Sequence, residues 1–238
     1  MGMDRYAQRV AKADWDGVTA EVNDLGCALL PQLLTPSEAA GIAKLYDDVS
    51  RFRATIDMAR HRFGRGEYRY FAHPLPPVVA ALRAAFWPHL LPIARDWAAR
   101  LGRPAPWPDD FEAWIRQCHD NGQTRPTPLI LRYGPGDWNA LHQDLYGDVF
   151  FPFQVLTVLS EPGVDFEGGE FVLLEQRPRA QSRAHVLTPP RGAFVVFPTR
   201  ERPNEGARGH HRVGLRHGVS TVTRGGRTAL GIIFHDAK

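Results

Sequence analysis

The chain has 238 residues, a formal net charge of +3 and a sequence pI near 9.1. At 43% hydrophobic it can bury a sizeable core, and the absence of a compositional break favours a single domain over residues 1–238. No stretch approaches about 18 consecutive apolar residues, and the charged N-terminus lacks the apolar core of a signal peptide, so we expect no membrane association and a cytoplasmic location.

Cysteine usage and charge distribution further limit the kinds of protein that this sequence can form. Cys27 and Cys118 lie far apart with no CxxC or Cys-His spacing, which argues against a disulfide framework and a zinc ribbon. Positive charge is concentrated in the second half of the chain. This charge predicts either a solvated basic surface or a nucleic-acid-binding surface, and the two alternatives have equal weight. The arginines concerned are Arg177, Arg179, Arg183, Arg200, Arg202, Arg208 and Arg212.

The first half, residues 1–127, is predicted to be mostly helical. Residues 4–22 form an amphipathic pattern, and GCALLPQLL then predicts a short strand. Thr35 as N-cap, Pro36 and Glu38 form the pattern of a capping box, which predicts a helix from there to about Phe52.

The rest of this half is predicted to contain a strand followed by helices. GEYRYFAH (66–73) predicts a strand, and the following apolar segment has helical spacing, although Pro88 and Pro92 should bend or divide that helix. FEAWIRQCH predicts one more short helix. These helices need a partner surface, and we expect a sheet to supply it.

From about Pro128 the pattern changes to eight short β-rich runs separated by Gly, Pro and Asp. The runs are PLILRYG, NALHQDL, VFFPFQVLTVL, GGEFVLLEQ, AHVLTP, GAFVVFP, HHRVGLRHGVSTV and TALGIIFH. Strands at this regular spacing predict a sandwich or barrel over residues 128–238. The fold class is therefore mainly β with helical support (α+β).

A candidate metal site lies in the second β-rich run. His142 and Asp144 are two residues apart, a spacing that places both side chains on one face of a strand. Two His and one carboxylate on one face of Fe(II) leave positions open for a bidentate keto acid and O2. His-x-Asp alone is a weak signal, because it arises often by chance.

The third ligand has three candidates, His210, His211 and His217. We favour His217, because Arg227 follows ten residues later beyond a TRGG turn, and a hairpin would bring this cation beside the metal. A buried keto-acid carboxylate needs such a partner. Arg224 competes weakly with Arg227 for that role, since its place in the turn suggests solvent exposure.

These residues together resemble the Fe(II)/2-oxoglutarate oxygenase superfamily, especially its prolyl-4-hydroxylase-like branch. The matching order is Tyr133-Gly-Pro-Gly, His142-x-Asp144, Gly168-Gly169-Glu170 and His217 followed by Arg227. The resemblance implies a double-stranded β-helix (jelly roll) with the N-terminal helices packed on one sheet. It also implies iron at His142, Asp144 and His217, and 2-oxoglutarate bound by Arg227 and Tyr133. Fe(II), 2-oxoglutarate and O2 are the implied cofactors, with ascorbate as a candidate reductant.

At a finer level, FEGGEFVLLEQRPRAQSRAHV, RVGLRHGVS and LGIIFHDA resemble a prokaryotic family catalogued as an oxidative demethylase of damaged DNA. This implies hydroxylation or oxidative demethylation of a substrate, with alkylated nucleic acid as one class. A protein or prolyl-type hydroxylase, a small-molecule hydroxylase and a non-catalytic cupin-like module remain alternatives. No second Arg follows Arg227, which departs from nucleotide-handling AlkB enzymes. The substrate and the oligomeric state stay open.

Two further segments are candidates for substrate contact. The aromatic residues Tyr146, Phe150, Phe151 and Phe153 directly follow the metal strand; they could line an entrance, but the alternation of VFFPFQVLTVL favours a core strand. The loop EQRPRAQSRAH could attract phosphate, although a plain surface loop is the favoured interpretation.

Overall fold

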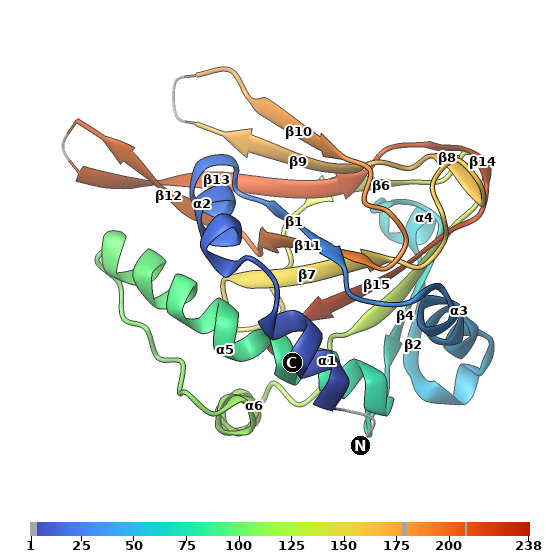
Figure 1. Cartoon of the computed structure of the whole chain (residues 1–238), viewed down its shortest axis with the longest axis horizontal. Coiled ribbons are helices and arrows are strands. Elements are labelled where there is room, and N and C mark those ends of the chain that lie inside the picture. The colour runs from blue at the N-terminus through green and yellow to red at the C-terminus, as the bar shows by residue number, and fades with distance from the viewer. Residues whose placement is uncertain (1–3, 178–179, 208) are drawn as a thin grey trace.

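The computed structural model describes residues 4–177, 180–207 and 209–238. Two antiparallel sheets face each other as in a jelly roll, and helices cover the outer side of the larger sheet (Figure 1). The larger sheet has the order β1 (Ala28–Gln32), β11 (Ala193–Pro198), β7 (Phe153–Val158), β15 (Arg227–Ile233), β5 (Leu129–Tyr133), β4 (Glu67–Phe71) and β2 (Phe52–Asp57).

The smaller sheet has the order β10 (Arg183–Leu187), β9 (Phe171–Gln176), β13 (Gly209–Val219), β6 (Trp138–His142) and β3 (Gly64–Arg65), and β12 (Glu201–Gly206) pairs with β13. A separate ribbon joins β8 (Phe166–Gly168) to β14 (Val222–Gly225). The helices are α1 (Asp4–Ala11), α2 (Trp15–Leu25), α3 (Pro36–Lys44), α4 (Met58–His61), α5 (Pro77–Arg100) and α6 (Phe111–Asp120), with short 3-10 turns at Leu45–Asp47 and Val49–Arg51.

The period-2 pattern of the large sheet divides the core into two layers. Leu230 and Ile232 of β15 pack outward into the large apolar cluster shared with α1, α2, α3, α5 and α6. Ala229, which precedes Leu230 and lies on the other face, packs against Leu173 and Leu215 of the small sheet. The expected packing of helices on one sheet is therefore confirmed, and the inner face is left free for a site.

The structure differs from the sequence prediction at three helices. Residues 4–22 form two helices, because Asp14 caps a new helix by accepting a hydrogen bond from the Gly17 amide. The capping box at Thr35 is confirmed, but that helix ends at Lys44 and gives way to 3-10 turns before β2. Pro88 and Pro92 do not divide α5.

Helix α5 is long and apolar enough to cross a membrane by length and composition, which the sequence reading did not anticipate. More than half of its most apolar window, 56%, is buried inside the protein. In its first third Arg83 is buried and donates to Asp236 at 2.8 Å. We therefore treat α5 as a core helix of this fold.

The aromatic cluster beneath the large sheet generates a stability prediction. Phe151 is fully buried against Trp87, Trp107 and Phe234, so Phe151→Ala should lower the free energy of unfolding by about 3–5 kcal/mol. Phe63, which is 48% exposed, supplies the matched control, and Phe63→Ala should cost less than about 1 kcal/mol. Urea denaturation followed by circular dichroism measures both; equal costs would contradict the assigned core.

Candidate metal centre and co-substrate pocket

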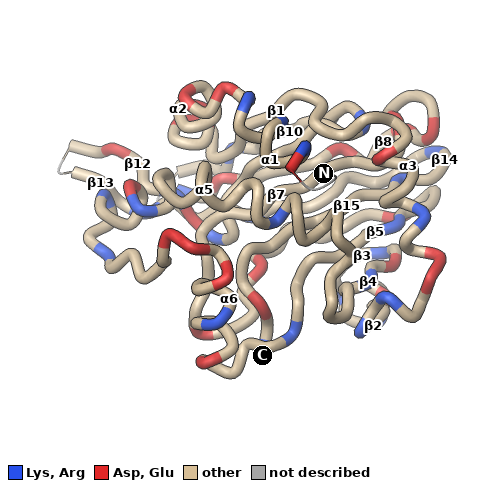
Figure 2. The backbone as a smooth tube through the Cα atoms, turned by 60° about the horizontal axis from the view of Figure 1, so that its bottom comes forward, with Lys and Arg blue, Asp and Glu red and all other residues tan. Residues whose placement is uncertain are grey.

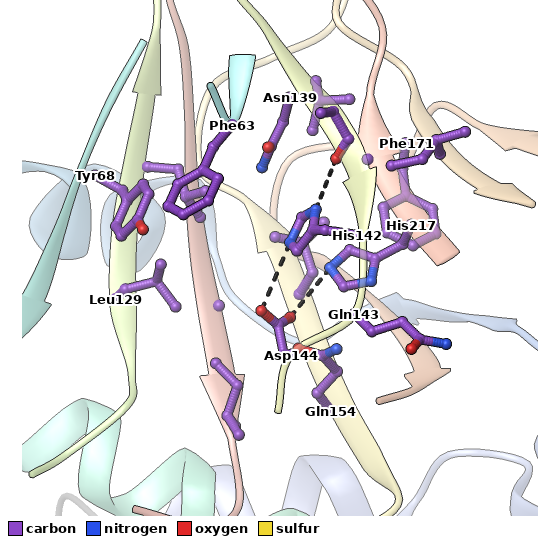
Figure 3. Close-up of a pocket in the computed structure, with 18 of the residues that line it drawn as sticks. Phe63, Tyr68, Leu129, Asn139, His142, Gln143, Asp144, Gln154, Phe171 and His217 are labelled. Atoms are coloured by element: carbon purple, nitrogen blue, oxygen red, sulfur yellow. Dashed lines mark hydrogen bonds and ion pairs between the residues drawn. The ribbon is translucent and has the colours of Figure 1, made fainter. Parts of the chain in front are cut away.

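The three candidate ligands meet on the inner face of the small sheet (Figure 3). His142 at the end of β6 lies directly opposite His217 on β13 in the antiparallel register. Asp144 follows two residues after His142, and its carboxylate lies 3.6 Å from His142 Nε2 and 3.2 Å from His217 Nε2. One ligand atom from each residue lies within 4.8 Å of the others.

Neighbouring groups fix the orientation and charge of these side chains. Nδ1 of His142 lies 2.7 Å from the Ala140 carbonyl, which leaves Nε2 facing Asp144. The Tyr146 hydroxyl donates to Asp144 Oδ1 at 2.6 Å. Burial raises the pKa of the Asp144 carboxyl, but His142 and His217 together outweigh it and hold that pKa far below its usual range.

The surroundings of His217 favour the neutral imidazole, which is the form that binds a metal. Burial and the neighbouring His142 lower the pKa of its imidazole, more than the hydrogen bond with Asp144 raises it. A neutral imidazole and an ionised carboxylate are the protonation states of metal ligands. The donor set of two imidazoles and one carboxylate therefore fits Fe(II).

Arg227 reaches the same cavity from the opposite sheet. It pairs with Tyr133 across β15 and β5, and its guanidinium lies 5.5 Å from the Tyr133 ring centroid. All three guanidinium nitrogens are buried without a hydrogen-bond partner among the described residues. Burial lowers the pKa of Arg227, yet an arginine stays charged, so this cation fits the distal carboxylate of 2-oxoglutarate.

The expected route from His217 to Arg227 is wrong in its geometry. We expected one hairpin, but β13 and β15 belong to different sheets, because the intervening β14 pairs with β8. Arg227 approaches the triad across the gap between facing sheets. Gly169 permits this, since it has a positive φ of 65° and a Cβ there would lie 2.8 Å from Arg227 Cδ.

The alternatives to these residues lie outside the site. His210 and His211 are exposed on the distal part of β13, opposite Glu205 and Asn204. Arg224 is exposed, as expected, and pairs with Glu167 at 2.7 Å.

A cavity of about 350 Å³ contains the triad, Arg227 and Tyr133. Tyr68, Tyr70 and Tyr146 form much of its aromatic wall. Of the four aromatic residues proposed as an entrance, Phe151 and Phe153 are core residues, Phe150 is half-buried and only Tyr146 lines the cavity. Gln154 also lines it, and its buried Nε2 has no partner among the described residues.

The sequence reading missed the segment that forms the cavity rim. Arg62 and Phe63 line the cavity from the short link between α4 and β3, and Arg65 follows in β3. All three side chains are exposed. The signal was present in RHRFGRG, which interleaves basic and aromatic residues.

The arginines singled out in the second half do not all lie on the surface. Arg179 and Arg208 lie outside the described residues. Arg202 is buried and, like Arg177, pairs with Glu175. Figure 2 shows Lys and Arg spread over the described part of the chain, with several on and around β2, β3 and β4.

Comparisons with known proteins agree with this architecture. The prolyl-4-hydroxylase of Pseudomonas putida superposes with a TM-score of 0.55 at 17% identity, covering 94% of this chain and 99% of that one. A 2OG-Fe(II) oxygenase family protein of Burkholderia pseudomallei superposes with a TM-score of 0.52 at 20% identity, covering 95% of this chain and 93% of that one. A prolyl hydroxylase of Trichoplax adhaerens superposes with a TM-score of 0.55 at 15% identity, covering 96% of this chain and 91% of that one. These likenesses confirm the jelly-roll fold.

Sequence comparison places the chain in a family. Two uncharacterised proteins from two strains of Mycobacterium tuberculosis are each 55% identical over 167 residues, which is 70% of this chain and 72% of theirs. A family model described as oxygenases catalysing oxidative methylation of damaged DNA matches residues 66–237. The chain therefore belongs to this oxygenase family and is an enzyme built on the fold of the Fe(II)/2-oxoglutarate oxygenases.

Proposed function

We propose that the enzyme is an Fe(II)- and 2-oxoglutarate-dependent dioxygenase that removes N-alkyl groups from nucleic-acid bases. The observation that carries the cofactor assignment is the buried guanidinium of Arg227, which has no hydrogen-bond partner within the described ranges and lies in the cavity that also holds His142, Asp144 and His217. A buried cation without a partner is costly, and a ligand carboxylate would supply the missing charge.

Each residue has a distinct part in this scheme. Nε2 of His142, a carboxylate oxygen of Asp144 and Nε2 of His217 would hold Fe(II), while Arg227 and Tyr133 would hold the distal end of 2-oxoglutarate. Fe(II), 2-oxoglutarate and O2 supply an oxidant that converts a C–H bond to C–OH, with release of CO2 and succinate. The Tyr146 hydroxyl keeps Asp144 oriented.

The rim supports nucleic acid as the substrate class. The exposed ring of Phe63 offers a face on which a base can stack, and the guanidinium groups of Arg62 and Arg65 lie beside it in sequence, where backbone phosphates can be bound. Figure 3 shows Phe63 and Tyr68 across from His142 in the cavity. Gln154 Nε2 also lines the cavity and finds no partner in the described part of the chain, so it would be free to donate to a base edge.

The direction of the reaction follows from its chemistry. Hydroxylation of an N-methyl carbon gives a hemiaminal, which breaks its C–N bond and releases formaldehyde and the unmethylated base. One oxygen atom of O2 enters the substrate and the other enters succinate, so the balance closes with removal of the methyl group. We further propose that the enzyme acts in the cytoplasm, where its two buried cysteines would stay free.

A single assay tests the proposal. The protein would receive Fe(II), ascorbate and 2-oxoglutarate anaerobically, followed by O2, and succinate would be measured with methylated oligonucleotides, peptides or free amino acids. We expect succinate formation to rise with methylated oligonucleotides, with equimolar formaldehyde. Stimulation only by a peptide or an amino acid would contradict the nucleic-acid assignment.

Removal of a candidate iron ligand should abolish turnover. His142→Ala, Asp144→Ala and His217→Ala each remove one of three ligand atoms, so Fe(II)-dependent succinate formation should fall below detection. His210→Ala removes an exposed imidazole from the same strand as His217 and should leave the rate unchanged. Normal turnover in any of the three variants would disprove that residue's role.

Arg227→Ala should raise the 2-oxoglutarate concentration needed for half-maximal rate by roughly 10- to 100-fold, because it removes charged hydrogen bonds worth about 1.5–3 kcal/mol. Arg224→Ala is the matched control, since Arg224 is exposed and paired with Glu167. Titration of 2-oxoglutarate in both variants makes the measurement. An unaltered requirement in Arg227→Ala would move the role to another cation.

Phe63→Ala should lower kcat/KM for a methylated oligonucleotide by roughly 5- to 100-fold, as expected for the loss of a stacking contact of about 1–3 kcal/mol. Substrate-independent succinate formation should stay the same, because Phe63 lies at the rim. The double variant Arg62→Ala/Arg65→Ala should weaken the dependence of binding on salt. If oligonucleotide kinetics and salt dependence are both unchanged, the cavity rim does not bind the substrate.

A further inference from the structure

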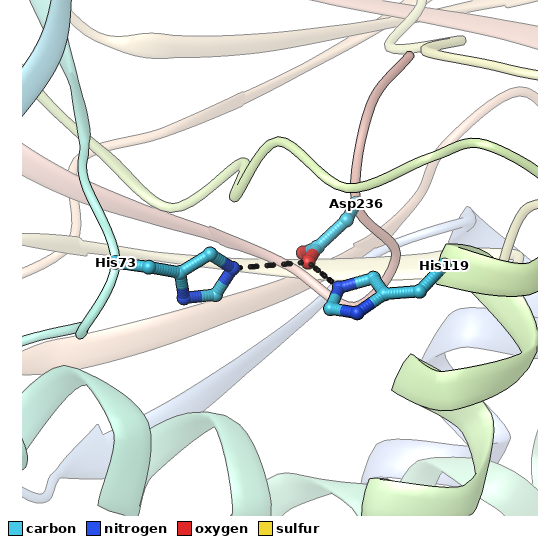
Figure 4. A group of neighbouring side chains, drawn as sticks. All are labelled: His73, His119 and Asp236. Carbon is cyan, nitrogen blue, oxygen red and sulfur yellow. Dashed lines mark hydrogen bonds and ion pairs between the residues drawn. The ribbon is translucent and has the colours of Figure 1, made fainter.

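A second group of metal-type ligands lies outside the cavity, at His73, His119 and Asp236 (Figure 4). One ligand atom from each residue lies within 4.8 Å of the others. His73 belongs to the link between β4 and α5, His119 to the last turn of α6, and Asp236 to the C-terminal segment. Three segments distant in sequence thus converge on one carboxylate.

The spacing of these atoms fits a bound ion. Asp236 Oδ2 lies 3.0 Å from His119 Nε2 and 3.5 Å from His73 Nε2. Ligand atoms about 2.1 Å from a tetrahedral metal are separated by about 3.4 Å. The approach of His73 is too long for a good hydrogen bond, so hydrogen bonding alone does not account for its position.

The surroundings of Asp236 match those of a metal-binding carboxylate. The residue is fully buried, and Arg83 donates to the other oxygen, Oδ1, at 2.8 Å, which turns Oδ2 toward the two imidazoles. The His73 and His119 side chains are 45% and 38% exposed, so water can reach a fourth position.

We propose that His73, His119 and Asp236 bind a structural divalent transition metal, with Zn²⁺ as the expected ion. Two imidazole nitrogens and one carboxylate oxygen are ligands that Zn²⁺ accepts, with water completing the coordination. The ion ties the C-terminal segment to α6 and to the link before α5. Its role is to stabilise the fold, and it takes no part in the oxidation.

This metal would support one wall of the cavity. His235, next to Asp236, accepts a hydrogen bond from the Phe151 amide at 3.2 Å, and its ring lies 6.1 Å from the Tyr146 ring. The Lys238 amide donates to the Tyr146 carbonyl at 3.1 Å. Holding the C-terminal segment in place therefore holds the segment that carries Tyr146.

The test uses the full chain with the first site disabled by His142→Ala/His217→Ala, so that failure of this proposal is separate from failure of the iron assignment. Equilibrium dialysis should find one bound Zn²⁺ per chain in this background and none after addition of His73→Gln or His119→Gln. Adding His210→Ala instead should leave one bound ion, since that histidine lies outside both ligand groups. The same background should melt about 5–10 °C higher at a Zn²⁺ concentration roughly one hundred times Kd.

Two results would overturn the proposal. One is a folded double variant, judged by its circular dichroism and cooperative melting, that binds no Zn²⁺. The other is retention of the bound ion in both His73→Gln and His119→Gln. Because Gln keeps a hydrogen-bond donor near Asp236 while removing the imidazole, a loss of binding with unchanged metal-free melting reports on the metal ligand itself.

Discussion

The buried guanidinium of Arg227 imposes the constraint on which the rest of the site depends. Its three nitrogens have no hydrogen-bond partner among the described residues, although the side chain is only 1% exposed. Burying an unpaired charge costs several kcal/mol, and under the proposed function the distal carboxylate of 2-oxoglutarate would pair with this guanidinium. Under the proposed function, Tyr133 beside it and the ligand triad in the same cavity would set the position of that carboxylate relative to the metal.

Each of the two facing sheets contributes a different pair of residues to the site. The small sheet contributes His142 and His217 as cross-strand neighbours, and the large sheet contributes Arg227 and Tyr133 as another such pair. Helices stabilise the large sheet from outside, which leaves its inner face free for a cavity of about 350 Å³. Because alternate residues of a strand point to opposite faces, the same strands supply site residues on the inner face and core residues on the outer face.

Local patterns allowed much of this to be predicted from the sequence. The capping box at Thr35 and the strand around His142 follow from patterns over a few residues, whereas His217 and Arg227 were chosen on an expected hairpin and on the family resemblance. The path from His217 to Arg227 did not, because strand pairing over long separations decides it: β14 pairs with β8 and so places β15 in the other sheet. The rim at Phe63 was missed for the same reason, since its proximity to the triad depends on β3 pairing with β6.

Arg227 and the triad should act on the two ends of one small ligand, and a crystal structure of the protein grown anaerobically with Fe(II) and 2-oxoglutarate tests this directly. The account predicts one metal ion bound by His142, Asp144 and His217, with the distal carboxylate of 2-oxoglutarate in hydrogen-bond contact with Arg227. A ligand that leaves the guanidinium of Arg227 unpaired, or a metal that none of the three residues binds, would contradict it.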